Sequence, residues 1–218
     1  MRTRFLIFLL TATLSVFAQD DAISSTVFSL TPRGNKDVRV NGLAIGAGLN
    51  ISEHNTIKQI NGLNIEINPL SLLIVMFDDP SRRGFSESAT ATINGISIGT
   101  GHSNQNEDIA YNGLEVSLFN TSHSCNGISI NGIYNYATNM NGIHLSTLSN
   151  YSKNANGLFL SFSNYSEKCN GLQIGFLNTT QTFKGIQIGI LNKTKNQKGL
   201  QIGFWNINSK RSTPFLNW

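Results

Sequence analysis

The second half of the chain repeats a unit of fourteen residues. Four units follow one another without a gap over residues 156–211, and they read NGLFLSFSNYSEKC, NGLQIGFLNTTQTF, KGIQIGILNKTKNQ and KGLQIGFWNINSKR. Three more units of fourteen or fifteen residues precede them, beginning at Asn112. A fixed short period indicates one small structural unit that stacks on copies of itself. Residues 112–211 therefore hold seven regular units.

Weaker copies of the unit begin upstream, at Asn41, Asn61 and Asn94, with irregular spacings of 20, 33 and 18 residues. Insertions in a repeat array fall on one face of it. We therefore interpret residues 41–111 as three units that carry loop insertions, which gives ten units in all. The flanking segments are expected to be an N-terminal cap or linker (19–40) and a C-terminal cap (212–218). The apolar run Ser71–Phe77 is expected to be a strand or a short capping element.

Within a unit, apolar and other residues alternate with a period of two. Leu172, Ile174 and Phe176 share one face of an extended chain, and Gln173 and Gly175 share the other. This pattern is typical of a β-strand with one buried face. We assign the aliphatic residues to the interior. On that assignment, replacing Ile188 by Asn would cost about 2–4 kcal/mol of stability.

An Asn follows each strand of the repeat, and a Gly stands second in every unit. Both residue types readily adopt the backbone conformations of tight corners. Two corners per unit return the chain to its starting side, so successive units should run parallel. The sequence therefore predicts an all-β fold, a β-solenoid of about ten short coils stacked at ~4.8 Å. A structural corner ladder is expected at Asn150, Asn164, Asn178, Asn192 and Asn206.

The alternative is an antiparallel outer-membrane β-barrel with a transport or anchoring role. Such a barrel also uses short alternating strands and often a terminal aromatic residue like Trp218. Against it, the strand core of about eight residues is shorter than the ~9–11 residues that a tilted spanning strand needs. The connections are also uniform, whereas a barrel alternates short turns with long loops. The solenoid is the favoured prediction.

The first eighteen residues have the features of a secretory signal peptide. Arg2 and Arg4 precede a mostly apolar stretch, and small residues stand at the usual positions before Gln19. A permanent membrane anchor is the alternative, but the apolar stretch is short for a bilayer. The protein is expected to be secreted or held in the cell envelope after cleavage near Ala18. Without residues 1–18, 14 basic residues face 12 acidic ones, a balance that gives no argument for nucleic acid as a partner.

The two cysteines, Cys125 and Cys169, both close their units and lie three units apart. Stacking would separate their backbones by roughly 14 Å. A disulfide needs Cα atoms within about 7 Å. The sequence therefore predicts two free, buried thiols in an apolar, inward-facing position.

We find no pattern that indicates an enzyme. The histidines (His54, His102, His123 and His144) hold non-equivalent unit positions, so stacking does not gather them into a metal site. There is no G-x-S-x-G elbow and no pair of carboxylates suited to glycoside hydrolysis. Accordingly, no catalytic residue, metal or cofactor is expected.

The most regular polar feature is a row of glutamines. On the strand assignment above, Gln173, Gln187 and Gln201 face outward and form a candidate binding face for a cell-surface glycan or protein. A plain solvated wall is the alternative, because one face of a half-buried sheet is polar in any case. The N-x-[ST] sequences at the corner asparagines are formal glycosylation acceptors, but a corner that requires Asn explains them equally well.

The units GLQIGFLN, GIQIGILN and GLQIGFWN, followed by a terminal PFLNW, resemble the tandem surface-repeat proteins of bacterial cell envelopes. The close match covers residues 156–218. The resemblance implies a secreted or surface location and no established biochemical activity. The sequence thus predicts a non-enzymatic repeat protein with a structural or adhesive role in a bacterial envelope. A membrane partner is expected only for the barrel alternative.

Overall fold

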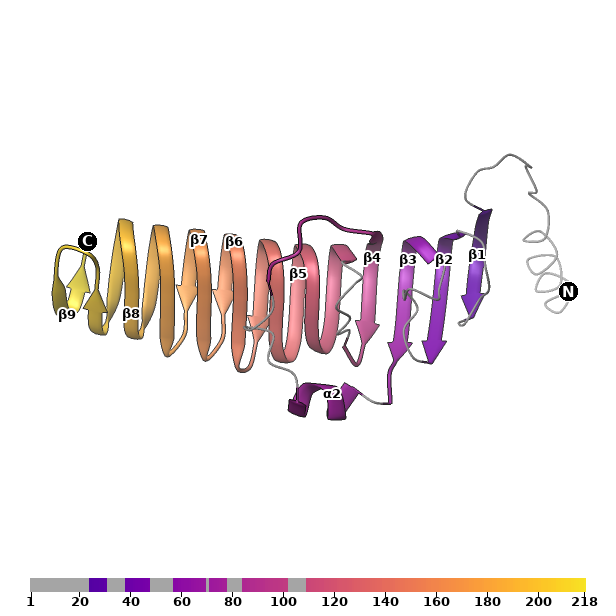
Figure 1. Cartoon of the computed structure of the whole chain (residues 1–218), viewed down its shortest axis with the longest axis horizontal. Helices are drawn as coiled ribbons and strands as arrows, with labels where there is room; N and C mark the ends of the chain where they lie inside the picture. Colours follow the sequence, from indigo (N-terminus) through magenta and orange to yellow (C-terminus); the bar gives the residue numbers. More distant parts are fainter. Residues whose placement is uncertain (1–23, 31–37, 48–56, 70, 78–83, 102–108) are drawn as a thin grey trace, which may run out of the picture.

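The protein is a straight rod of stacked, flattened coils (Figure 1). The computed structural model describes residues 24–30, 38–47, 57–69, 71–77, 84–101 and 109–218. The elements are β1 (Ser24–Leu30), β2 (Val38–Ala47), β3 (Ile57–Ile67), α2 (Ser71–Phe77), β4 (Ala91–Gly99), β5 (Ile109–Ser146), β6 (Ser149–Leu160), β7 (Ser163–Ile174), β8 (Leu177–Ile207) and β9 (Ser212–Asn217). The strands form one sheet in sequence order. The signal-peptide prediction for residues 1–18 lies outside the described residues.

Neighbouring coils run parallel and stay in register with the repeat. The Asn-Gly pairs lie beside one another from β2 to β5, and the same register continues between β5, β6, β7 and β8. The ten repeat glycines stack in one column from Gly42 to Gly199, which bounds nine complete turns. The predicted parallel β-solenoid is confirmed. The barrel alternative is wrong, because it requires antiparallel neighbours.

Both ends of the stack carry an added strand. β1 pairs parallel with β2, which places Phe28 beside Leu43 and Leu30 beside Ile45. At the other end, β9 turns back and pairs antiparallel with the last turn of β8, with Leu216 beside Ile202. An antiparallel strand does not repeat the edge that a further parallel coil would pair with. β9 thus covers the terminal edge as expected for a C-terminal cap, a device that limits end-to-end growth.

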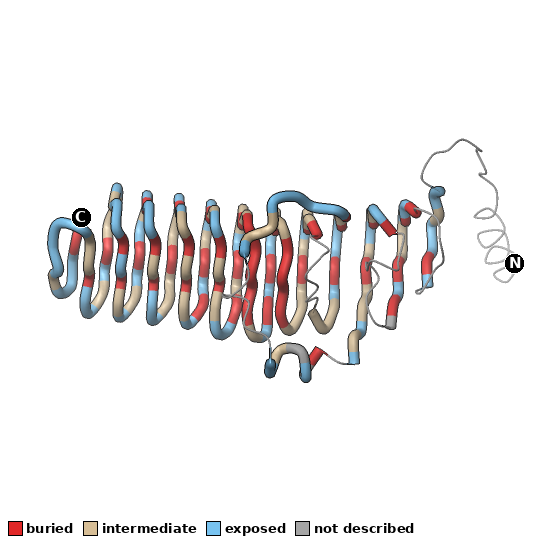
Figure 2. The backbone as a smooth tube through the Cα atoms, in the orientation of Figure 1, coloured by how far each residue is buried: buried red, intermediate tan, exposed pale blue. Residues whose placement is uncertain are grey.

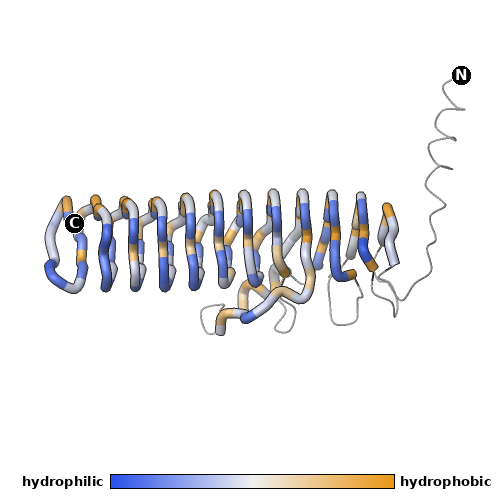
Figure 3. Tube along the Cα trace, turned by 90° about the horizontal axis from the view of Figure 1, so that it is seen from above, coloured by the Kyte–Doolittle hydropathy of each residue, from blue (hydrophilic) through white to orange (hydrophobic). Residues whose placement is uncertain are grey.

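The insertions interrupt only one part of the coil. In the first three units the strand that contains Asn-Gly is intact, and the chain leaves the repeat after Ala47, after Ile67 and after Gly99. The second insertion contains α2, so the expectation of a strand at Ser71–Phe77 is corrected to a short helix, although the alternative of a capping element allowed it. Phe85, from the same insertion, stacks on Tyr136 at 5.3 Å. In Figure 3 the described part of the insertion that contains α2 lies on the side away from the edge where hydrophobic residues recur.

The residues that close each unit form the main apolar column inside the rod. Figure 2 shows buried residues as bands that recur at the same place in successive coils. The column comprises Val40, Ile60, Ile93, Tyr111, Cys125, Met140, Ala155, Cys169 and Phe183, all buried. Cys125 and Cys169 are free thiols, as predicted. Burial raises the pKa of each to about 12, so both remain protonated.

Candidate functional site

The glutamine row lies inside the rod, which corrects the candidate binding face. Gln173, Gln187 and Gln201 have exposed fractions of 0–1%. Gln187 Nε2 donates to Gln173 Oε1 at 2.7 Å, and Gln201 Nε2 donates to Gln187 Oε1 at 2.9 Å. Asn217 of β9 continues the row by donating to Gln201 Oε1 at 3.0 Å. Each amide satisfies its neighbour, which makes burial of these polar groups tolerable, and a buried row cannot contact a partner.

The corner asparagines form a second internal ladder, as predicted. Each side-chain amide donates to the Oδ1 of the next coil at 2.7–3.0 Å, linking Asn150, Asn164, Asn178, Asn192 and Asn206. The same amides also reach backbone carbonyls, for example from Asn178 to Ile188 O at 2.9 Å. All five side chains are buried. The ladder therefore has a structural role in the folded rod and its side chains are not presented for glycosylation.

A third ladder was not foreseen. The first Asn of successive units donates to its predecessor at 2.6–2.9 Å, in an unbroken series through Asn41, Asn61, Asn94, Asn112, Asn126, Asn141 and Asn156. The signal was present in the sequence as the recurring N of NG, but only the Gly of that pair was assigned to a corner. Lysines replace it in the last two units, at Lys184 and Lys198.

Because the polar residues point inward, the aliphatic residues of the strand face solvent. Ile186 is 41% exposed and Ile188 is 39% exposed. The third and fifth positions of each unit hold only aliphatic residues, none of them buried: Leu43, Ile45, Leu63, Ile65, Ile96, Ile98, Leu114, Val116, Ile128, Ile130, Ile143, Leu145, Leu158, Leu160, Leu172, Ile174, Ile186, Ile188, Leu200 and Ile202. β1 and β9 extend the two columns with Phe28, Leu30 and Leu216. We call this surface the apolar wall.

A shallow groove runs along one border of the apolar wall. One side is the fifth-position column, including Ile174 and Ile188, and the other side includes Phe162 and Phe176. Its floor is the column of small residues between them, Ser161, Gly175, Gly189 and Gly203. The groove has a volume of about 620 Å³. Phe162 and Phe176 stack with their ring centroids 4.9 Å apart. This lining suits an aliphatic or aromatic ligand surface.

A second groove, on the opposite border of the wall, combines an apolar lining with lysine and asparagine side chains. It has a volume of about 530 Å³ and is lined by Lys168, Lys184 and Lys198 together with the amides of several asparagines. No carboxylate is among its described lining residues. Its chemistry suits an anionic or hydroxyl-rich ligand.

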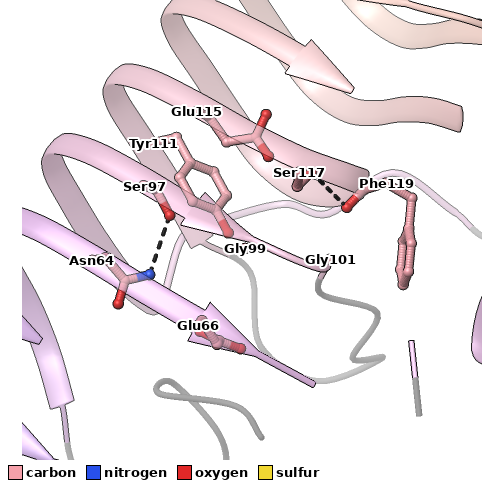
Figure 4. Close-up of a pocket in the computed structure, with 9 residues that line it drawn as sticks. All are labelled: Asn64, Glu66, Ser97, Gly99, Gly101, Tyr111, Glu115, Ser117 and Phe119. Atoms are coloured by element: carbon pink, nitrogen blue, oxygen red, sulfur yellow. Dashed lines mark hydrogen bonds between the residues drawn. The ribbon is translucent and has the colours of Figure 1, made fainter. Parts of the chain in front are cut away.

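Figure 4 shows a small pocket of the rod whose lining includes two acidic side chains, Glu66 and Glu115. Glu115 and Tyr111 are buried there, and Glu66 lies two coils away, on β3, with β4 in between. Asn131 donates to Glu115 Oε2 at 2.8 Å. The enclosed space is about 10 Å³, roughly the volume that one water molecule needs. This cavity is therefore too small for an organic substrate.

Burial shifts the pKa values of two side chains, Glu115 and His144, in the direction that favours the uncharged form of each. Burial raises the pKa of Glu115 to about 7, against the opposing effect of hydrogen bonds from Ser117 and Asn131. Burial lowers the pKa of His144 to about 4. His144 Nδ1 lies 2.8 Å from Ser129 Oγ, and its ring stacks on Phe159. Burial, followed by the charges of Glu115, Glu66 and Cys125, raises the pKa of Tyr111.

We expect these two groups to give opposite pH dependences that cancel in the wild type. Between pH ~4.5 and ~7 the folded state holds the Glu115 proton more tightly than the unfolded state, so stability falls as pH rises. Between pH ~4 and ~6.5 the unfolded state holds the His144 proton more tightly, so stability rises with pH. Each slope amounts to about 3 kcal/mol over its window, at ~1.4 kcal/mol per pKa unit.

Single substitutions should expose each slope. The Glu115→Gln variant should become more stable as the pH rises from 4 to 6.5, because only the effect of His144 remains. The His144→Phe variant should become less stable as the pH rises from 4.5 to 7, because only the effect of Glu115 remains. Urea unfolding midpoints measured at half-unit pH steps test this, with the wild type expected to stay flat between pH 4.5 and 6.5. Flat profiles for both variants would contradict the burial of these groups.

His123, the other histidine among the described residues, does not join them. His123 Nδ1 lies 3.4 Å from Ser86 Oγ, and His54 and His102 lie outside the described residues. Among the residues placed by the structure, no three His, Cys, Asp or Glu side chains group as a metal site would require. In the same residues there is no helix whose length and hydrophobicity would let it cross a membrane.

Comparisons with protein-family models, with curated proteins and with solved structures returned no match to this chain.

Proposed function

We propose that the protein is a secreted, non-enzymatic repeat protein of the bacterial envelope with a structural or adhesive role, and that the apolar wall is its docking surface. The observation that carries this proposal is the uninterrupted aliphatic surface on the outside of the rod. Large apolar residues that recur at every coil need a partner, because contiguous exposed patches on soluble proteins mark interaction sites.

The size of the wall supports this proposal. Eleven or twelve strand rungs at ~4.8 Å give a length of about 50 Å, and the two columns with the residue between them give a width of about 10 Å. The resulting area of about 500 Å² lies in the upper part of the ~300–600 Å² range of the largest patch on a typical monomer. The insertions also leave the strand of the wall intact in every unit. A surface kept clear along the entire rod is suited to an extended partner.

A glycan or protein partner at the cell surface stays a prediction, but we now assign its contact to different residues. The glutamines that were expected to contact it are buried. Among the described residues, we assign this contact to the amines and amides of the second groove, around Lys168, Lys184 and Lys198. Hydroxyl-rich ligands could accept hydrogen bonds from its amides and amines.

Envelope retention of the exported protein tests the proposal. The wall variant is Ile174→Glu combined with Ile188→Glu, and the matched control is Gln181→Glu combined with Asn196→Glu, which adds two carboxylates to exposed positions elsewhere on the same coils. All chains are produced with residues 1–18 in a Gram-negative bacterium, and their N-termini are read by mass spectrometry. We expect the wild type and the control in the envelope fraction and the wall variant in the soluble fraction.

Thermal melting must show that the wall variant is folded. Substitutions at exposed positions of this kind usually lower the free energy of unfolding by about 1 kcal/mol or less. A folded wall variant that stays in the envelope fraction would remove the apolar wall as the docking surface. An N-terminus that still contains residues 1–18 would contradict the expected cleavage near Ala18.

A further inference from the structure

We propose that the apolar wall lies on the surface of an anionic lipid bilayer, with the rod parallel to the membrane plane. This inference rests on the proposed function, because it names the partner of the same surface. It also differs from the expectation that a membrane would be contacted only by a barrel. Here the solenoid itself supplies the membrane-facing surface.

The backbone of the wall suits contact with hydrocarbon. Inside a bilayer each backbone N–H and C=O must be satisfied within the protein. From β2 to β8 the wall strands pair on both sides with neighbouring strands, and only the end strands β1 and β9 pair on one side. The wall therefore presents aliphatic side chains, and its backbone groups are used between coils.

Aromatic side chains gather at the C-terminal end of the wall. Phe204 and Phe215 are each 70% exposed, Trp218 is 67% exposed and Trp205 is 42% exposed. Trp205 Nε1 donates to Ser212 Oγ at 2.9 Å, and Arg211 lies 4.4 Å from the centroid of the Trp218 ring. Tryptophans with an apolar ring and a polar partner are enriched where a bilayer meets water. A wholly aqueous role offers no reason for four exposed aromatics in one place.

The charges around the wall match an anionic surface. Lys184 and Lys198 precede Ile186 and Leu200 by two residues, and their long side chains can keep the amines at headgroup level while the stems lie on apolar surface. Residues 112–218 contain eight Lys and Arg but only two acidic residues, and one of these, Glu115, is buried. Anionic leaflets attract basic segments of this kind.

A second copy of the chain is the competing occupant. It could cover the aliphatic columns, but it would bring little negative charge to the lysines. Of the four side-chain carboxylates on described residues, Glu66 and Glu115 belong to the strands of the wall, and Glu115 is buried. A bilayer that contains anionic lipid supplies both an apolar layer and a charged layer, so it matches the wall and its borders together.

The two tryptophans of the chain, Trp205 and Trp218, report on the contact directly. The exported protein is titrated with vesicles of phosphatidylcholine containing 30% phosphatidylglycerol, and with vesicles of phosphatidylcholine alone. We expect a blue shift of tryptophan emission, quenching by brominated acyl chains, and flotation of the protein with the anionic vesicles.

The variants assign that binding to the wall and its lysines. Ile174→Glu with Ile188→Glu should weaken the apparent Kd for anionic vesicles at least tenfold, and the Gln181→Glu with Asn196→Glu control should change it less than threefold. Lys184→Gln with Lys198→Gln should weaken binding to the anionic vesicles several-fold and leave phosphatidylcholine vesicles unaffected.

Absence of binding and of a blue shift, or a folded wall variant that binds like the wild type, overturns the bilayer proposal. Light scattering on the same samples tests whether a second copy of the chain covers the wall instead of a bilayer. A dimer that the wall variant converts to a monomer, without vesicle binding, assigns the wall to a second copy and overturns the bilayer proposal as well. In that case wall-dependent envelope retention would still support the proposed function, whereas loss of both results would remove the two together.

Discussion

Replacing Gln187 by leucine should lower the free energy of unfolding by about 2–5 kcal/mol, since this change breaks three buried hydrogen bonds at about 1–1.5 kcal/mol each and leaves polar atoms unsatisfied. Gln187 donates to Gln173 Oε1 and to Thr180 Oγ1, and it accepts from Gln201 Nε2. Leucine is similar in size and apolar. A substitution that improves a conventional core should therefore damage this one.

Ile188→Asn is the matched control, one residue along the same strand. Because Ile188 is 39% exposed on the apolar wall, the asparagine stays hydrated, and we expect a loss of about 1 kcal/mol or less. This corrects the larger cost predicted when Ile188 was assigned to the interior. Urea unfolding of both variants gives the comparison. A smaller loss for Gln187→Leu than for Ile188→Asn would reverse the assignment of inside and outside.

A triple variant separates broken hydrogen bonds from altered packing. Changing Gln173, Gln187 and Gln201 to leucine together removes donors and acceptors in the same column. Removal of both partners of a hydrogen bond can be nearly neutral. The triple variant should therefore cost less than the sum of the three single changes, as coupled neighbours require.

The second large effect is expected at the glycine column. Gly185→Ala should destabilise the rod by about 3–5 kcal/mol or prevent folding, because a positive φ is strained for alanine and the neighbouring coil leaves no space for a Cβ. Gly185 has φ +134°, and a Cβ there would collide with the carbonyl oxygen of Gly171 on the preceding coil. Relief of the collision requires the two coils to separate, which weakens the hydrogen bonds between them.

Gly84 provides the control for Gly185. A Cβ at Gly84 meets no described atom within 4 Å, so Gly84→Ala should change stability by about 0.5 kcal/mol or less. Circular dichroism melts of the two variants test the difference. Equal melting temperatures would mean that the coils can separate at Gly185 without loss, and the tight stacking of the glycine column would then be wrong.

The sequence alone determined the stack. The fourteen-residue period, the invariant glycine of the unit and the closing asparagine were sufficient to predict parallel coils, the ladder from Asn150 to Asn206 and two buried, unpaired cysteines. These features are predictable because they depend on local backbone geometry and on register. Both are the same in every copy of the unit. The helix at Ser71–Phe77 was missed because it lies in an insertion, where no repeat constrains the conformation.

What only the tertiary structure decided is which side of the strand faces inward. A period of two defines two faces, and the general preference for buried aliphatic residues selected the wrong one. On a continuous strand, residues two apart face the same side. Phe183 was assigned to the interior, so a strand that is continuous through Lys184 places both Gly185 and Gln187 inside. In a parallel stack, identical amides meet at one coil spacing and satisfy each other. Their burial then costs little, and the aliphatic residues become the outer surface on which the proposed function depends.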